Sequence, residues 1–275
     1  MLIYANGSWV PEDEAVIPFN DQGFLYGDSL FETIRINSAK PFRLEKHLHR
    51  MQSGMSTVHL EAESLLAEIP GILETYILKN EIEDALARVI ITRGVSTGTP
   101  WNTLSEPAMY IFSRSISKVP LGPVKVIFVE EKNYPILRFH PAIKSGNYLG
   151  NMLAKKDAEK VGAFEPVFVN REGYVTECAI RNIFFVKGET LLTPALELGV
   201  LPGVIRDTIL ELAKGRGLNV QETLIREDDI DKMDEAFISS TGVGVLPVTW
   251  DGFKSNYKFS QILAGDLLEL YKSGE

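Results

Sequence analysis

The sequence predicts an α+β protein made of two domains. Strand-like and helix-like segments alternate along the chain, yet several strands also come as hairpins around short turns, which favours the α+β class. A length of 275 residues suits one large domain or two modest ones. The best candidate linker lies at 115–123. We therefore expect a smaller N-terminal α/β domain over 1–116, a linker over 117–123 and a larger, strand-rich domain over 124–275.

The N-terminal half predicts a hairpin, further strands and two helices. Asn6 and Gly7 form a typical two-residue turn between the strand-like residues 2–5 and 8–10. Apolar periodicity then separates strands from amphipathic helices. The remaining expected elements are, in order, strand 29–36, helix 41–59, helix 63–79, strand 87–92, loop 93–100 and strand 108–113.

The C-terminal half predicts hairpins between two helices. Short turns at 171–173 and 188–189 each join two strand-like runs, and Gly215 and Gly217 stop the last expected helix. The expected elements are strand 124–130, a helix from about 146 to 161, strands 165–170, 174–177, 182–187 and 190–193, and helix 203–214.

The composition excludes several classes of protein. A net charge of −9 argues against general nucleic-acid binding, which relies on a basic surface. No apolar run approaches the roughly 20 residues of a membrane span, and the N-terminus lacks a signal-peptide pattern. The single cysteine, Cys178, excludes an intramolecular disulfide and fits a reducing compartment. We expect a cytoplasmic protein without a membrane partner, a nucleic-acid partner or a metal site.

Two ionisable residues stand where chemistry is plausible. Lys144 lies between the apolar end of a strand-like run and the start of a helix. Most lysines in such places point to solvent, but a desolvated lysine can form a Schiff base through its partly neutral amine. Glu177 ends the run 174–177. A carboxylate there is usually solvated, but it could also hold a pyridine nitrogen protonated.

Two other segments could bind an anion. In the run Leu201-Pro202-Gly203-Val204-Ile205, Gly203 precedes a helix whose first N–H groups have no acceptor within the helix. Such a glycine is as often only a turn residue. The small hydroxylated residues 239–241 follow a strand and either cap it or donate to phosphate oxygens.

Together these features resemble the class IV (fold-type IV) aminotransferases. The order Lys144, Glu177, 201–205 and 240–241, preceded by 26–35 and 47–51, matches the motifs of that family. The resemblance spans about 2–250 and is most specific over 176–206. The family contains branched-chain aminotransferases, D-amino acid aminotransferases, some R-selective amine transaminases and 4-amino-4-deoxychorismate lyase. It implies a two-domain fold, pyridoxal 5′-phosphate as cofactor and usually a homodimer.

The resemblance also implies a role for each motif residue. Lys144 would carry the cofactor as a Schiff base and move the substrate proton, and Glu177 would pair with the pyridine nitrogen. Arg50 would grip the phosphate through two-pronged contacts. The other implied cofactor-binding residues are Leu201 on the ring face, Gly203, the N–H groups of Val204 and Ile205, and the hydroxyls of Ser240 and Thr241. An amino acid and a 2-oxo acid would react in turn, giving ping-pong kinetics.

Substrate choice stays open between three alternatives. D-amino acid aminotransferases have an arginine and a histidine where this chain has Gly98 and Pro100, yet 143–158 and 238–241 resemble that group. The segment 31–35 instead resembles branched-chain enzymes and the lyase. We rank a D-amino acid transaminase with a non-standard carboxylate pocket first, a branched-chain L-amino acid transaminase second and the lyase third. The candidate substrate-binding residues are Phe31, Thr33, Arg35, Arg93, Arg138 and Arg181, although each arginine more commonly has a structural role.

Overall fold

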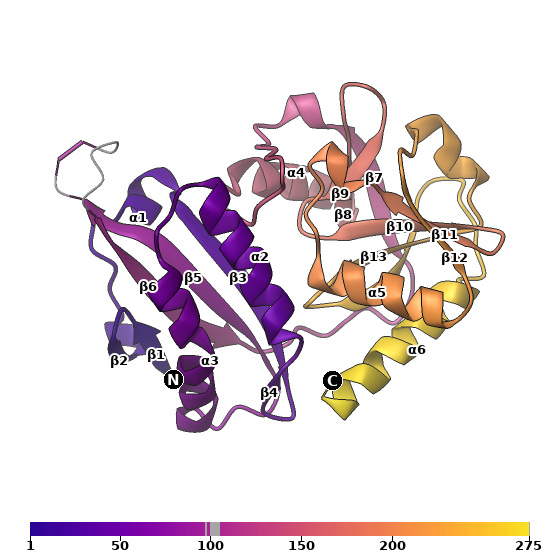
Figure 1. Ribbon diagram of the computed structural model, residues 1–275. Coiled ribbons are helices and arrows are strands. Elements are labelled where there is room, and N and C mark those ends of the chain that lie inside the picture. Colours follow the sequence, from indigo (N-terminus) through magenta and orange to yellow (C-terminus); the bar gives the residue numbers. More distant parts are fainter. Residues whose placement is uncertain (97, 100–104, 275) are drawn as a thin grey trace. The chain divides into compact units, whose positions relative to one another are not determined.

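The computed structural model describes residues 1–96, 98–99 and 105–274, which form two compact units (Figure 1). The first unit is Met1–Ile116 with Ile143–Asn147 and Gly274–Glu275, and the second is Ser117–Ala142 with Tyr148–Ser273. The segment around Lys144 packs with the first unit because Phe31 N donates to Lys144 O (3.0 Å) and Gly146 N to Ser29 O (2.9 Å). A single boundary near 116, as the sequence predicts, does not account for the return of the chain to the first unit at Ile143–Asn147. The expected domain limits stay a prediction.

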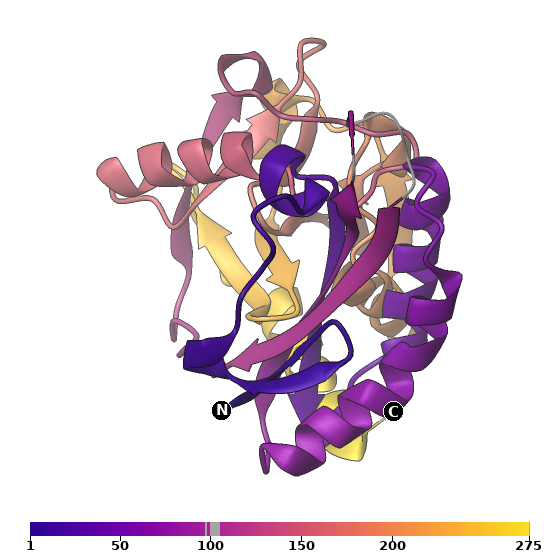
Figure 2. The ribbon, with the colours of Figure 1, turned by 90° about the vertical axis from the view of Figure 1, so that its left-hand side faces the viewer.

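A six-stranded antiparallel sheet forms the first unit, in the order β2-β1-β6-β5-β3-β4. The helices α2 (Leu44–Thr57) and α3 (Glu63–Lys79) pack along one side of this sheet (Figure 2). The elements are β1 (Leu2–Ala5), β2 (Ser8–Pro11), η1 (Glu12–Glu14), α1 (Gln22–Tyr26), β3 (Ser29–Asn37), β4 (Lys40–Pro41), α2 (Leu44–Thr57), α3 (Glu63–Lys79), β5 (Ala85–Ser96) and β6 (Ser105–Arg114).

The strand β3 has two different faces. Side chains alternate across a strand, so Leu30, Ile34 and Ile36 point to the core that α2 and α3 cover. Phe31 and Arg35 therefore lie on the opposite face of the sheet. That face is the one on which candidate substrate-binding residues gather.

The second unit contains a mixed eight-stranded sheet, in the order β12-β11-β10-β13-β14-β7-β8-β9. Its core includes the stacked rings of Phe184 and Phe237, whose centroids lie 4.8 Å apart. The elements are β7 (Val124–Glu130), η2 (Glu131–Asn133), α4 (Leu149–Lys160), β8 (Glu165–Val169), β9 (Val175–Cys178), β10 (Asn182–Lys187), β11 (Thr190–Pro194), η3 (Leu196–Leu198), α5 (Val204–Gly215), β12 (Asn219–Thr223), η4 (Glu227–Lys232), β13 (Glu235–Ser240), β14 (Gly244–Thr249) and α6 (Lys258–Ser273).

The predicted α+β class is confirmed, and so are most of the predicted elements. The loop predicted over 93–100 is wrong in its first part, because β5 continues through a bulge to Ser96. Gly94 makes this possible: its φ is +81°, and a Cβ there would lie 1.8 Å from Glu106 O on the neighbouring strand. The predicted helices over 41–59 and 146–161 begin three residues late, at Leu44 and Leu149. In the described part of the chain, no helix is both long and apolar enough to span a membrane.

Candidate active site

Lys144 lies beside an aromatic ring in the first unit. Its Nζ is 4.4 Å from the ring centroid of Phe31, and its side chain is half-buried. The guanidinium carbon of Arg88 lies 3.8 Å from the same centroid. Phe31 thus contacts two cationic side chains, an arrangement stabilised by the negative face of the ring.

Arg88 belongs to a basic surface that the motifs did not indicate. It lies on β5 directly across from Thr33 of β3, so the two share one sheet face with Phe31 and Arg35. We call Phe31, Thr33, Arg35 and Arg88 the basic sheet face. The signal in the sequence is a lone arginine in the otherwise apolar run 85–91. Two guanidinium groups on one face have the chemistry to hold a carboxylate.

Arg50 is held by a buried carboxylate. Glu32 accepts hydrogen bonds from Arg50 Nε (2.7 Å) and Arg50 Nη2 (2.5 Å), and its Oε2 lies 2.6 Å from His47 Nδ1. Glu32 and His47 are both almost fully buried. Burial alone would raise the pKa of the Glu32 carboxyl, but Arg50 and His47 outweigh it and lower that pKa to about 2. Burial lowers the pKa of His47, because its effect outweighs the opposing effect of the Glu32 carboxylate.

Two of the candidate arginines have structural partners. Arg93 pairs with Asp28 at 2.5 Å and donates to the carbonyl oxygens of Val58 and His59, which ties β5 to the end of α2. In the second unit, Arg181 pairs at 2.5 Å with Glu165, a fully buried carboxylate. Gly98 is exposed, and Pro100 lies outside the described residues.

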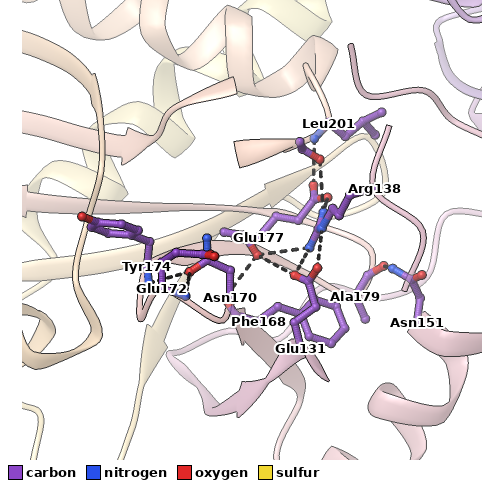
Figure 3. Close-up of polar contacts among 12 residues, drawn as sticks. Glu131, Arg138, Asn151, Phe168, Asn170, Glu172, Tyr174, Glu177, Ala179 and Leu201 are labelled. Carbon is purple, nitrogen blue, oxygen red and sulfur yellow. Dashed lines mark hydrogen bonds and ion pairs between the residues drawn. The ribbon is translucent and has the colours of Figure 1, made fainter. Parts of the chain in front are cut away.

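Glu177 lies at the centre of a polar cluster in the second unit (Figure 3). Its Oε1 accepts from Arg138 Nη1, and its Oε2 accepts from the backbone N–H of Leu201 at 3.1 Å. Each carboxylate oxygen can accept a further hydrogen bond. Glu177 is therefore oriented from two sides while it keeps acceptor capacity for a cationic N–H group.

Arg138 is fully engaged within this cluster. Its Nε donates to Glu131 (3.1 Å), its Nη1 to Glu177 and to Gly199 O (3.3 Å), and its Nη2 to Glu131 (2.8 Å) and Thr176 Oγ1 (3.1 Å). An arginine side chain has five N–H donors, and these contacts occupy all of them. Arg138 therefore has no donor left for a substrate carboxylate.

The segment 201–205 forms a tight turn before α5. Asn182 Nδ2 donates to Leu201 O at 2.9 Å, and a Cβ on Gly203 would lie 2.1 Å from Asn182 Oδ1. Gly203 is the N-cap and carries no capping side chain, so the first N–H groups of α5, at Val204 and Ile205, have no side-chain acceptor among the residues that the structure describes. Such groups and the positive end of the helix dipole favour an anion.

Hydroxyl groups line the end of β13 next to this turn. Ser239 is opposite Asn182 in the β10–β13 ladder, and its buried Oγ has no hydrogen-bond partner among the described residues. Ser240 and Thr241 follow and are partly buried. A turn with N–H donors and hydroxyls beside it fits a phosphate group, and the Glu177 carboxylate fits a pyridinium nitrogen.

Cys178, next to Glu177, is 1% exposed, and burial raises the pKa of its thiol well above the usual range. A buried thiol that stays protonated is a poor nucleophile. Cys178 therefore acts as a small apolar core residue, as the sequence predicts.

Comparison with known families gives a consistent result. The family model described as amino-transferase class IV matches residues 29–250. A solved branched-chain amino acid aminotransferase from Escherichia coli superposes with a TM-score of 0.86 at 25% identity, covering 98% of this chain and 94% of that one.

Three curated relatives carry three different activities. They are a putative branched-chain-amino-acid aminotransferase of Methanocaldococcus jannaschii (31% identity; 90% of this chain, 87% of the relative), an aminodeoxychorismate lyase of Bacillus subtilis (32%; 90% and 86%) and a D-alanine aminotransferase of Listeria monocytogenes (30%; 90% and 87%). The activities named for these relatives differ in substrate and, for the lyase, in reaction type.

Proposed function

Because the chain belongs to the class IV aminotransferases, which depend on pyridoxal phosphate, we propose that it transfers the amino group of a D-amino acid to a 2-oxo acid. The cofactor, when bound, supplies an electron sink for negative charge at the substrate Cα. The residues of the chain must then hold the cofactor, orient the substrate carboxylate and move the α-proton.

We assign the cofactor and the proton transfer to Lys144. The assignment is supported by its motif, by its half-buried position beside Phe31 and by the short distance of 4.4 Å between Nζ and that ring.

Glu177, Arg50 and the turn before α5 are assigned to the rest of the cofactor. Glu177 would face the pyridine nitrogen, because its carboxylate is oriented from two sides and keeps acceptor capacity. The phosphate would bind the N–H groups of Val204 and Ile205, the hydroxyls of Ser240 and Thr241, and Arg50, while Leu201 would pack on the ring. These roles follow the family motif and the donor chemistry of each residue.

The basic sheet face is the observation on which the substrate class depends. Arg93 pairs with Asp28, Arg138 with Glu131 and Glu177, and Arg181 with Glu165. Arg35 and Arg88 share one sheet face with Phe31, the residue beside Lys144. We propose that these two arginines bind the carboxylate that D-amino acid enzymes hold with the residues replaced here at Gly98 and Pro100.

The branched-chain alternative also has a specific support. Arg35 lies in the segment 31–35 that resembles branched-chain enzymes, and the Methanocaldococcus relative carries that name. The lyase is the third candidate because of the Bacillus relative. It would release pyruvate rather than exchange an amino group.

A half-reaction distinguishes these candidates. The holoenzyme would be mixed with D-alanine, D-glutamate, L-leucine and L-glutamate separately, without an oxo acid, and conversion to the pyridoxamine form followed by absorbance. We expect conversion by the D-amino acids. Conversion by the L-amino acids alone would overturn the proposal in favour of the branched-chain activity. No conversion, together with pyruvate release from aminodeoxychorismate, would establish the lyase.

Variants connect this assay to the basic sheet face. Arg35→Met and Arg88→Met should each slow the half-reaction by roughly 10–100-fold, since a charge-assisted hydrogen bond contributes ~1.5–3 kcal/mol. The matched control is Arg171→Met, an exposed arginine in the turn between β8 and β9, which should not change the rate. If Arg35→Met and Arg88→Met react as fast as the parent and the control, the substrate carboxylate is bound elsewhere.

We further propose that the protein is a homodimer. One segment of the first unit exposes six large apolar side chains: Val16, Ile17, Phe19, Phe24, Leu25 and Tyr26. Exposed apolar clusters of this kind mark interaction surfaces, and a second copy is the occupant that the family expectation supplies.

Light scattering after gel filtration tests the dimer. Replacing Phe19 (80% exposed) and Phe24 (68% exposed) with serine should give a monomer. The control is Leu78→Ser, which alters a side chain of similar exposure (71%) on α3 and should leave the dimer intact. A parent protein that is monomeric at micromolar concentration would contradict this proposal.

A further inference from the structure

The polar cluster around Glu177 contains a second carboxylate that no step of the proposed reaction uses. Glu131 follows β7 directly and contacts the Nε–Nη2 edge of Arg138 with both of its oxygens, at 3.1 and 2.8 Å. Arg138 contacts Glu177 with Nη1, at the other side of the same guanidinium group (Figure 3). The guanidinium therefore lies between two carboxylates.

The three side chains share a secluded environment. Their side-chain exposures are 17% for Glu131, 16% for Arg138 and 14% for Glu177. Gly199, with a φ of +72°, brings its carbonyl oxygen to Arg138, and a Cβ there would lie 3.3 Å from the arginine side chain. Charges in such surroundings are weakly screened, so each one affects the others more than it would at the surface.

The balance of charge explains why two carboxylates are useful. Glu177 with Arg138 alone would form a neutral pair, and a neutral pair attracts a pyridinium cation weakly. With Glu131 added, the cluster carries one net negative charge. The two-pronged contact from Glu131 also holds the guanidinium plane, which leaves Nη1 facing Glu177.

We propose that Glu131 is a positioning residue that cancels the charge of Arg138, so that Glu177 keeps its full negative charge for the protonated pyridine nitrogen of the cofactor. This inference rests on the proposed role of Glu177. It predicts that Glu131 affects the binding of a protonated ring nitrogen without touching the cofactor. A purely structural role would affect every ligand of the site alike.

The test compares two ligands rather than two activities. One is pyridoxal phosphate, and the other is its 1-deaza analogue, in which a C–H group replaces the ring nitrogen. The dissociation constant of each would be measured for the cofactor-free full chain. The dissociation constant of the deaza analogue divided by that of pyridoxal phosphate measures the preference for the ring nitrogen. This ratio isolates the contribution of the ring nitrogen, because a general loss of stability weakens the binding of both ligands and cancels.

Glu131→Gln should reduce this ratio by about tenfold. Glutamine keeps the size of the side chain and an acceptor for Arg138, but it removes the charge, and a nearby charge shifts such an equilibrium by a factor of roughly ten or more. Glu131→Asp, which keeps the charge, should keep most of the ratio. The matched control is Asp266→Asn: Asp266 also contacts an arginine, Arg216, through two hydrogen bonds, but far along the chain on α6. It should leave the ratio unchanged.

A double variant protects the test against misfolding of the single one. Glu131→Gln with Arg138→Gln removes both compensating charges, so no unbalanced guanidinium remains, and the ratio should return to within about threefold of the parent. A double variant with a ratio as low as that of Glu177→Gln would overturn the proposal. So would a Glu131→Gln protein whose ratio equals the parent's while Glu177→Gln lowers it.

The variant Glu177→Gln distinguishes a failure of this inference from a failure of the proposed role of Glu177, on which the inference rests. If Glu177→Gln leaves the ratio unchanged, Glu177 does not face the ring nitrogen, and both proposals fail together. If Glu177→Gln lowers the ratio and Glu131→Gln does not, only the role of Glu131 fails.

Discussion

Gly203 offers the sharpest test of the proposed phosphate site. The Cβ introduced by Gly203→Ala would lie 2.1 Å from Asn182 Oδ1, closer than any real contact of that kind. The backbone itself would accept alanine, since φ and ψ are −64° and 134°. The Asn182 side chain must therefore move, and its hydrogen bond to Leu201 O is lost.

The size of the effect follows from that hydrogen bond. A lost hydrogen bond with a partner left unsatisfied costs about 1–3 kcal/mol. The same turn carries the Leu201 N–H group that contacts Glu177 and the N–H groups assigned to the phosphate. We expect the free energy of unfolding to fall by about that amount and cofactor affinity to fall roughly 10–100-fold.

The assay is a cofactor titration followed by absorbance, beside a urea unfolding curve of the cofactor-free protein. Gly215→Ala is the matched control, because it lies at the other end of the same helix and its Cβ would meet nothing within 4 Å. Alanine there should be neutral or stabilise the helix by up to ~1 kcal/mol. A Gly203→Ala protein that binds cofactor within threefold of the parent would refute the assignment of this turn to the phosphate.

Four other predictions concern residues of the same site. Lys144→Ala should abolish turnover with the unfolding curve unchanged, and residual transamination would show that another amine is used. Arg50→Ala should weaken cofactor binding by roughly 10–100-fold in the same titration, since charge-assisted contacts contribute ~1.5–3 kcal/mol. Glu177→Gln should retain the cofactor but slow α-proton exchange, measured by deuterium loss from a Cα-labelled amino acid; an unchanged rate would count against it. Because burial keeps the pKa of His47 below 6.5, the unfolded chain binds a proton first as the pH falls, so stability should decrease from about pH 6.5 downward, by at most ~1.4 kcal/mol per pH unit. Below pH 4.5 the protonation of Glu32, whose pKa is about 2, should add a second loss on the order of 3 kcal/mol. Urea curves of His47→Gln should lack the first loss and show a smaller second one, because His47 is one of the groups that lower the pKa of Glu32.

Local patterns predicted the regular elements of the chain well. Helix α3 and strands β7 and β10 have the predicted bounds, because their periodicity and flanking turn residues agree. The C-terminal helix α6 was not predicted, although Leu263, Leu267 and Tyr271 are buried at helical spacing. Four-residue spacing over a single short stretch is a weak signal when the surrounding composition is mixed.

Strand β14 was also missed, for a different reason. It contains Pro247, which cannot donate to a ladder and so argues against a strand. Its neighbour β13 nevertheless pairs with it at that position. Only the long-range pairing, which no local pattern carries, makes Gly244–Thr249 a strand.

The same distinction between local patterns and long-range contacts applies to the candidate site. Motifs indicated Lys144 and Glu177 because their chemistry is tied to short sequence signatures. They could not indicate that all five N–H groups of Arg138 donate to residues 7 to 61 positions away in the sequence. Nor could they indicate that Arg93 and Arg181 pair with half-buried or buried carboxylates. Arg88 was overlooked because its relation to Phe31 depends on the register of two strands.

The identity of the cofactor-bearing lysine is the central claim, and one measurement tests it directly. The holoenzyme would be reduced with borohydride, which makes the link between cofactor and lysine permanent, and then digested and analysed by mass spectrometry. The account predicts a phosphopyridoxyl group on the peptide that contains Lys144 and on no other. A phosphopyridoxyl group on a different lysine, with Lys144 unmodified, would contradict it.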